Sequence, residues 1–384
     1  MSTDLKKTLK ELARMQPDEG YVLSVYVNAV PDGKGRRNFN VFLKKKFNEI
    51  EKGLKPRSPE AGALPKDLRE ISRYLEEDLN PGSKGAAVFI SQKKNIFTTF
   101  QTVVPLDNKV VVSRVPYLYP LARLADDYAR YGILISDERH AKLLRVLLGQ
   151  LEEEADIITA ADDDTAKGYQ SRKGRLGWND EKHQRHLNDL VAKHVKEALR
   201  EARGFFPVDI ATLLVAAENG TLAEINRQLP SGFRNKMLTT AKFDIRSPIK
   251  KVLEESLKIF SGMENRGSQK TAKEVVVLAK SRGKGAVLGT KATLGALQDG
   301  RAEVLIVSEK YSGEGWQCRD CLKMGALRKP AFCIYCGSAE IDRRPDLKEE
   351  MVSLALRYGA RVEFVDGSPE LDANGGIGAL LKSR

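Results

Sequence analysis

Several common features are scarce or missing in this sequence. It has four cysteines and four histidines in 384 residues. Its longest apolar stretch, residues 210–217, is far shorter than the roughly 20 residues of a membrane span. The opening residues MSTDLKKTLK contain no apolar signal region, and no GxxxxGK[ST] phosphate-binding loop occurs. We therefore expect a cytoplasmic protein without a membrane segment, for which any GTPase would have to be a partner.

The composition is that of a folded protein with a basic surface. Hydrophobic residues make up 41% and charged residues 30%, which is typical of globular domains. Lysine and arginine number 64 against 52 acidic residues, so the net charge is +12 and the pI about 9.3. This balance is compatible with a polyanionic partner, nucleic acid first, and equally with a surface that is basic only to stay solvated. The length predicts two or three domains, and the pattern below favours three.

The first block, residues 1–116, predicts an α+β domain. Residues 21–30 (YVLSVYVNAV) are rich in β-formers and end at the turn signal Pro31-Asp32-Gly33. A basic loop, residues 33–38, leads into a helical pattern that starts at Phe39. Further strands are expected at 85–91, 95–104 and 110–115.

The second block, residues 117–261, predicts an α/β domain with a long loop. The expected elements are a helix from Leu121, strands at 131–136 and 141–148, a long helix from about Glu181, a covered parallel strand at 210–217, and helices at 222–228 and 249–260. Residues 161–180 are polar, dotted with glycine and without period, so we expect an exposed loop. The small polar residues 261–269 are interpreted as a domain boundary.

The third block, residues 262–384, predicts a small α/β sandwich. Helices are expected at 273–282, 291–300 and 347–358, and strands at 286–289, 302–307 and 361–365. An insertion at residues 311–344 carries every cysteine of the chain.

The cysteines form two CxxC knuckles, Cys318-Arg-Asp-Cys321 and Cys333-Ile-Tyr-Cys336. Two such pairs supply the four thiolates of a structural zinc ion, and the alternatives are two disulfides or four unrelated thiols. A closed four-thiolate site has no open position for substrate, so the expected role of Zn²⁺ is to fold a zinc ribbon that has little core of its own. We expect its removal to unfold residues 311–344 and to leave the rest folded.

The order of these motifs resembles a known superfamily. The last block, from GRAEVLIVSEKY through the zinc knuckles, DLKEEMVSLA, RYGARVEFV and NGGIGALL, resembles the third domain of archaeal and eukaryotic class-I peptide-chain release factors. The middle block resembles the second domain of that superfamily, especially its bacterial release-factor-like branch, which includes the hibernation factor Balon; Pelota is a further relative. The first block is only loosely similar.

The resemblance implies a GGQ-like loop before the long helix. In true release factors the glutamine of this motif reaches the peptidyl-transferase centre and helps water attack peptidyl-tRNA. Here Gly168-Tyr169-Gln170-Ser171 lies at a similar place, so Gln170 is the candidate catalytic residue. A rival register aligns Gly177-Trp178 and Gln184-Arg185-His186 with a pattern of the bacterial branch and puts Asp180 at the glutamine position. The motif is degenerate in either register.

The departure from that motif has a physical consequence. Glycines let the main chain approach a substrate closely, and the Tyr169 side chain would hinder that approach. The stop-codon motifs NIKS and YxCxxxF are also missing from the first block. We therefore favour occupancy of the ribosome without hydrolysis and without decoding, and keep a peptidyl-tRNA hydrolase using Gln170 as the alternative.

Basic residues in two places are candidates for contact with ribosomal RNA. The candidates are Lys34, Arg36 and Arg37 in the first block and Lys167, Arg172, Lys173, Arg175, Trp178 and Arg185 around the long loop. Lysines 44–46 are further candidates in the first block, unless they only face water opposite Phe42 and Phe47. His183, His186 and His194 are interpreted as polar residues on the helix surface, because no third metal ligand occurs at a recognisable spacing.

Together these features predict a three-domain protein that enters the ribosomal A site and acts in hibernation or rescue. The expected partners are ribosomal RNA, peptidyl-tRNA and a translational GTPase, for which the resemblance to Balon suggests elongation factor Tu. An RNA-binding adaptor that never meets a ribosome is the alternative from another class.

Overall fold

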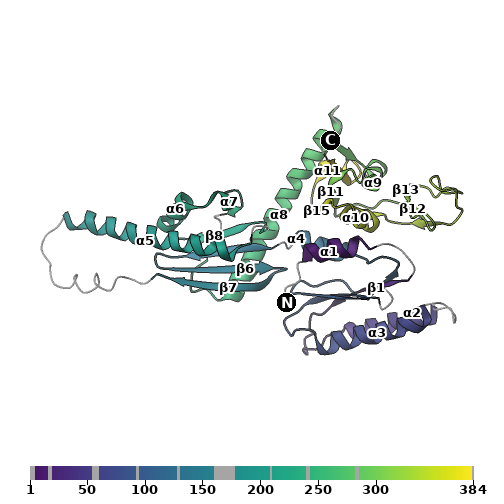
Figure 1. Cartoon of the computed structure of the whole chain (residues 1–384), viewed down its shortest axis with the longest axis horizontal. Coiled ribbons are helices and arrows are strands. Elements are labelled where there is room, and N and C mark those ends of the chain that lie inside the picture. Colours follow the sequence, from purple (N-terminus) through teal and green to yellow (C-terminus); the bar gives the residue numbers. More distant parts are fainter. Residues whose placement is uncertain are drawn as a thin grey trace. The chain divides into compact units, whose positions relative to one another are not determined.

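The computed structural model describes residues 5–15, 20–53, 60–91, 95–127, 130–159, 178–207, 210–238, 243–281 and 285–382. The chain divides into two compact units (Figure 1). The outer unit joins Met1–Asp127 with Ser261–Arg384, and the central unit is Tyr128–Phe260. Among the described residues, no helix combines the length and the apolar character that a membrane span requires.

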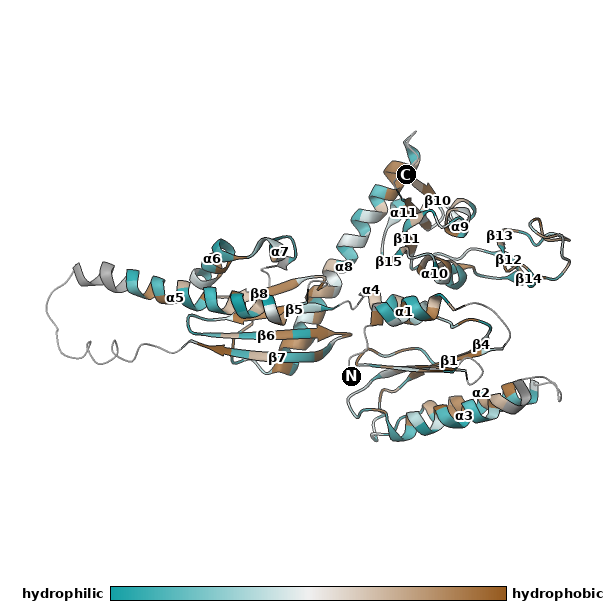
Figure 2. Cartoon of the chain, in the orientation of Figure 1, coloured by the Kyte–Doolittle hydropathy of each residue, from teal (hydrophilic) through white to brown (hydrophobic). Residues whose placement is uncertain are grey.

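The N-terminal part of the outer unit is an antiparallel sheet with two helices on one face. Its strands, in the order β3-β2-β1-β4, are β1 (Val22–Asn28), β2 (Gly85–Ser91), β3 (Ile96–Thr102) and β4 (Lys109–Ser113). The two helices on that face are α2 (Phe39–Gly53) and α3 (Glu60–Glu77), and a further helix, α1 (Leu5–Ala13), precedes β1. Because strand side chains alternate, Leu23, Val25 and Val27 point to the core shared with α2 and α3. Both helices carry brown and teal segments, as amphipathic helices do (Figure 2).

The C-terminal part of the outer unit has helices on both faces of a mixed sheet, as the predicted sandwich requires. The sheet order is β10-β16-β11-β15, with β10 (Ala286–Leu288), β11 (Ala302–Ser308), β15 (Arg361–Val365) and β16 (Ile377–Leu381). Leu305 and Val307 of β11 join the cluster that includes α9 (Thr290–Gln298) and α10 (Lys348–Arg357). Ile306 faces the opposite cluster, with α8 (Ile249–Lys280) and α11 (Pro369–Asp372).

Helix α4 (Tyr119–Asp127) belongs to the outer unit. Tyr119 packs edge-on against Phe364 of β15, with ring centroids 5.5 Å apart. The Asp126 carboxylate accepts a hydrogen bond of 2.7 Å from the Phe364 backbone N–H. The helix expected from Leu121 is therefore present, and it packs on the C-terminal sheet.

The central unit is a five-stranded mixed sheet with the order β7-β6-β5-β8-β9. Its elements are β5 (Tyr131–Ser136), β6 (His140–Leu147), β7 (Gln150–Ile158), α5 (Trp178–Phe205), β8 (Leu213–Ala217), α6 (Asn219–Gln228), α7 (Ser231–Arg234) and β9 (Met237–Leu238). Strands β5, β8 and β9 are parallel, and β6 and β7 form an antiparallel hairpin beside β5. The prediction of a covered parallel strand within residues 210–217 is confirmed.

Strand β5 is buried on both faces along its whole length. Leu134 packs in the cluster formed with Val195 and Ala198 of α5. On the other face the Tyr131 ring stacks on Phe260 of α8 at 4.6 Å, and its hydroxyl lies 3.0 Å from Ser256 Oγ. Helices therefore cover both faces of the sheet at β5, which is the layered α/β arrangement.

The expected domain boundary at residues 261–269 begins where the central unit ends, at Phe260, but the chain crosses it as a continuous helix, α8. The polar side chains there do not mark a loop. The Asn265 Oδ1 accepts a hydrogen bond from the Asp366 N–H at 3.1 Å, and Gln269 Nε2 donates to the Asp366 carbonyl at 2.9 Å. These residues are polar because they bind the backbone that follows β15.

Other elements were not foreseen or begin elsewhere. Helices α1 and α3 and strands β7 and β16 had no predicted counterpart, and α5 begins at Trp178, before the expected Glu181. Strand β7 is half exposed and carries three successive glutamates, 152–154, so its sequence lacks the alternation of apolar and polar residues that would predict a strand. The predicted loop 161–180 falls mostly on residues 160–177, which lie outside the described residues.

Gly132 in β5 provides a test of the central core. A Cβ atom at Gly132 would lie 2.7 Å from Phe206 Cε1 and 3.0 Å from Leu213 Cδ1. We expect Gly132→Ala to lower the free energy of unfolding of the central unit by about 1–3 kcal/mol, because overpacking forces the neighbours apart. The denaturant dependence of hydrogen exchange in residues 130–136 measures this change.

Gly204→Ala is the matched control, because no atom lies within 4 Å of its added Cβ. This control should leave the central unit unchanged or stabilise α5 by up to about 1 kcal/mol, the ordinary helix preference for alanine. Equal effects of the two substitutions would contradict close packing at Gly132.

Candidate metal centre and predicted RNA-binding residues

The cysteines lie in a three-stranded antiparallel ribbon inserted between β11 and α10. The ribbon order is β13-β12-β14, with β12 (Gly315–Cys318), β13 (Met324–Ala326) and β14 (Ile341–Arg344). Its buried cluster contains Trp316, Cys318, Cys333 and Ile341. The Trp316 indole covers Gly325 so closely that a Cβ there would lie 2.4 Å from the ring. Such a small core is too little to fold a domain of this kind alone.

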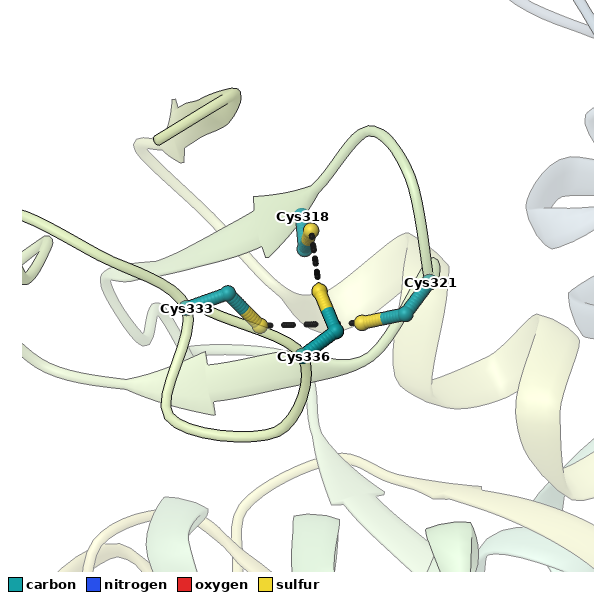
Figure 3. A group of neighbouring side chains, drawn as sticks. All are labelled: Cys318, Cys321, Cys333 and Cys336. Carbon is teal, nitrogen blue, oxygen red and sulfur yellow. Dashed lines mark hydrogen bonds between the residues drawn. The ribbon is translucent and has the colours of Figure 1, made fainter. Parts of the chain in front are cut away.

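The four thiol sulfurs converge on one point (Figure 3). All lie within 4.8 Å of one another. Cys318 Sγ is 3.6 Å from Cys336 Sγ, and Cys321 Sγ is 3.6 Å from Cys333 Sγ. Tetrahedral zinc with Zn–S bonds of about 2.3 Å places its sulfurs about 3.8 Å apart. The distances match that geometry and are much longer than a disulfide bond of about 2.05 Å; all four cysteines are free thiols.

Each knuckle reverses direction directly after its second cysteine. Leu322 has a φ of 59° and Gly337 a φ of 78°, both in the left-handed region. The turns close through backbone bonds from Leu322 N–H to the Cys318 carbonyl at 3.1 Å and from Gly337 N–H to the Cys333 carbonyl at 2.8 Å. The backbone therefore holds both pairs of thiols in place.

The protonation of the thiols is uneven. A hydrogen bond from the Cys321 backbone N–H lowers the pKa of Cys318 to about 7, whereas burial raises the pKa of Cys321 to about 12. Four thiolates this close repel one another unless a cation lies between them. The donor set and its spacing fit a structural divalent zinc ion, which would fix the fold of the ribbon and leave no position for substrate.

Two of the three predicted RNA-binding residues before α2 are exposed. The Asp32 carboxylate accepts 2.8 Å hydrogen bonds from the backbone N–H groups of Lys34 and Arg36, and these bonds lower its pKa. They tighten the turn and leave the Lys34 and Arg36 side chains outside. The Arg36 Nε also lies 3.4 Å from Asp32 Oδ2, a weak surface pair.

Arg37 has a role inside its own domain. Its Nη2 donates to the carbonyl oxygens of Asn80 at 2.7 Å and Pro81 at 2.9 Å. These bonds hold the turn between α3 and β2. The Nη2 donors of Arg37 are therefore engaged within its own domain.

The remaining predicted RNA-binding residues are only partly described. Gln170 and the predicted RNA-binding residues Lys167, Arg172, Lys173 and Arg175 lie outside the described residues. Trp178 is the first residue of α5, and Arg185 is exposed one to two turns further on. On α2, Lys44 and Lys45 are exposed, and Lys46 pairs with Glu49 at 2.8 Å.

The interpretation of His194 as a surface residue is wrong. It is 1% exposed, and burial lowers the pKa of its imidazole. Its Nδ1 lies 2.7 Å from Thr159 Oγ1 and its Nε2 lies 3.3 Å from Ser136 Oγ. Thr159 Oγ1 also donates to Glu197 at 3.1 Å. His194 thus ties α5 to the ends of β5 and β7, which are distant in sequence, and no local signal could have shown this. His186 is exposed, as predicted.

The chain thus combines a central unit built on a mixed five-stranded sheet with a thiol-rich ribbon inserted in a small α/β sandwich. Residues 116–261 match the family model of the bacterial archaeo-eukaryotic release factor family 10. The resemblance to release-factor-like proteins is confirmed by this match. No curated protein matches the chain.

Several solved structures are similar at low identity. They are the archaeal translation termination factor aRF1 (16% identity, 99% of this chain and 97% of that chain, TM-score 0.27), Archaeoglobus fulgidus Pelota (13%, 78% and 79%, 0.35), and the C-terminal domain of a peptide chain release factor from Methanosarcina mazei (22%, 37% and 97%, 0.28). With TM-scores this low, the proposal below rests on the family match and not on these structures.

The zinc site predicts a local effect of metal removal. We expect the purified chain to bind one Zn²⁺ and Cys321→Ser to lose it. Because binding supplies on the order of 10 kcal/mol towards folding in such sites, hydrogen exchange should rise sharply in residues 315–344 and stay unchanged in residues 131–136. Native mass spectrometry and hydrogen exchange measure the two effects.

Ala339→Ser is the control, since it adds a hydroxyl to the ribbon outside the thiol cluster. It should keep the metal. Cooperative loss of protection along the whole chain on chelation would contradict a locally folded ribbon.

His194 predicts a pH dependence of the central unit. Its pKa is lowered in the folded state, so below about 6.5, the ordinary value, the unfolded chain binds more protons than the folded one. The stabilisation by neutral His194 is full above that pH and falls as the pH drops towards the folded pKa. The nearby carboxylates of Asp137 and Glu197 act in the opposite direction, since their charge raises the pKa of His194.

Urea unfolding at pH 7 and pH 5 tests this. We expect wild type to lose more stability between the two pH values than His194→Gln, which cannot titrate. His186→Gln, an exposed histidine of the same helix, should behave like wild type. Identical pH dependences in wild type and His194→Gln would rule out this role.

Proposed function

We propose that this protein is a release-factor-like ribosome-binding factor that occupies the A site in hibernation or rescue. The observation that carries the proposal is the family match of residues 116–261, which covers the whole central unit. The net charge of +12 supports a ribosomal RNA partner. The exposed Lys34 and Arg36 supply phosphate contacts at one end of the chain.

The proposal includes three functional domains, residues 1–116, 117–261 and 262–384. The first faces the decoding centre, the second reaches the peptidyl-transferase centre with residues 168–170, and the third meets a translational GTPase such as elongation factor Tu. Zn²⁺ held by Cys318, Cys321, Cys333 and Cys336 shapes the third domain and takes no part in chemistry.

Within this proposal the factor occupies the A site without hydrolysing peptidyl-tRNA. Tyr169 replaces a glycine next to Gln170, and its side chain prevents the close backbone approach that a substrate-contacting tip requires. Stop-codon decoding is excluded from the proposal because the first block has neither of the decoding motifs.

Sedimentation with 70S ribosomes, empty or loaded with peptidyl-tRNA, tests the binding. We expect stoichiometric cosedimentation at physiological salt. Lack of binding to both kinds of ribosome would overturn the proposal and favour an RNA-binding adaptor.

A peptide-release assay on the loaded ribosomes tests the chemistry. We expect background release from wild type, Gln170→Ala and Asp180→Ala alike. Release by wild type that Gln170→Ala abolishes would establish the hydrolase alternative, and loss in Asp180→Ala alone would favour the rival register. Tyr169→Gly shows whether the tyrosine is what blocks the reaction.

A further inference from the structure

The outer end of the ribbon exposes large apolar side chains in close succession. Within residues 327–335, here called the ribbon tip, Leu327 is 69% exposed, Phe332 62%, Ile334 72% and Tyr335 52%. The other exposed large apolar side chains among the described residues are scattered over several elements. Single exposed apolar residues are ordinary, but a group of four on a small ribbon indicates an interaction site.

The backbone at Leu327 gives a second, independent indication. Its φ is 71°, in the left-handed region where a leucine is strained by about 1 kcal/mol or more and where glycine or asparagine fits better. The strained side chain has no packing role, since it is largely exposed. The backbone N–H of Leu327 donates to the Glu314 carbonyl at 2.9 Å, so the backbone is held while the side chain is left to solvent, as is common at functional positions.

The charge around the tip is of one sign. No acidic residue occurs between Asp320 and Glu340, whereas Lys323, Arg328 and Lys329 do. Among the described residues, Arg328 and Lys329 are exposed and form no ion pair. The nearest acids along the chain, Glu340 and Asp342, are bound by Arg319 at 3.3 and 2.6 Å. The tip therefore complements an anionic ligand.

The aromatic ring of Tyr335 is contacted by two residues of the ribbon. The buried Trp316 lies 6.3 Å from it, centroid to centroid, and Lys323 Nζ lies 5.9 Å from its centre. Trp316 is itself fixed against Gly325. The ring is held by the ribbon core although half of its surface is exposed.

We propose that the ribbon tip binds unpaired bases of single-stranded RNA. Phe332 and Tyr335 offer faces on which bases stack, Leu327 and Ile334 cover the sides of the bases, and Arg328 and Lys329 meet the phosphates. A second copy of this chain fits poorly, because a symmetric contact would bring the cations against themselves. A protein partner would need only an apolar side chain at position 332 and not an aromatic ring. The substitutions below distinguish such a partner from RNA. The inference does not depend on ribosome binding.

Fluorescence anisotropy of the full chain with labelled 12-nucleotide oligo(U) and oligo(A), and with an RNA duplex of the same length, tests the proposal. We expect a preference for the single strands. Phe332→Ala and Tyr335→Ala should each weaken binding about 5- to 100-fold, the effect of losing one stacked base. Phe332→Leu should lose as much as Phe332→Ala, and Phe332→Trp should keep the affinity.

The salt dependence tests the cations separately. Replacing both in the double variant Arg328→Gln/Lys329→Gln should reduce the slope of log affinity against log salt by about 1.4, at about 0.7 per single-strand phosphate. Tyr358→Ala is the control, because Tyr358 is a comparably exposed aromatic residue, at 45%, outside the ribbon. Zinc content measured on every variant confirms that the ribbon is folded.

Ultraviolet cross-linking locates the RNA independently of the other basic parts of the chain. Cross-linked nucleotides within residues 327–336 are expected. Affinities of Phe332→Ala and Tyr335→Ala within twofold of wild type, with no cross-link in that segment, would overturn the proposal and indicate a protein-binding tip. RNA binding that is retained in Phe332→Leu would overturn base stacking on this ring.

Discussion

The burial of β5 on both faces is the constraint from which the central unit is built. No side chain of this strand reaches solvent, so a layer of helix must lie on each side of the sheet. Helix α5 supplies one layer through Val195 and Ala198, and the first part of α8 supplies the other through Ser256 and Phe260. At Gly132 the packing leaves no room even for a methyl group.

The ribbon, unlike the central unit, is not stabilised mainly by a hydrophobic core. Its buried cluster consists of Trp316, Ile341 and two of the four cysteines, so metal coordination takes the place of a hydrophobic core. The two knuckle turns and the Trp316–Gly325 contact set the positions of the thiols. Such a ribbon does not need apolar residues elsewhere to fold, and this is why the exposure of Phe332 and Ile334 calls for a ligand.

The sequence predicted those features whose cause is local. The thiol cluster follows from spacing, and β2, β5 and β15 follow from apolar runs bounded by turns. Prediction from the sequence failed where contacts between residues distant in the chain determine the structure. The sequence does not show that Asn265 and Gln269 lie on a continuous helix and bind the backbone at 366–367, and His194 was interpreted as a surface residue although Ser136 and Thr159 contact it. Exposed apolar residues inside a metal knuckle, such as Ile334, were a readable signal that was missed.

The buried histidine also joins the two parts of the described chain that flank residues 160–177. Thr159 is the last described residue before them, and α5 begins at Trp178, directly after them. Because Thr159 is hydrogen-bonded to His194 and to Glu197, both on α5, the end of β7 is held to the body of α5 by partly buried contacts. The same histidine that makes the central unit sensitive to pH therefore also ties its β-hairpin to α5.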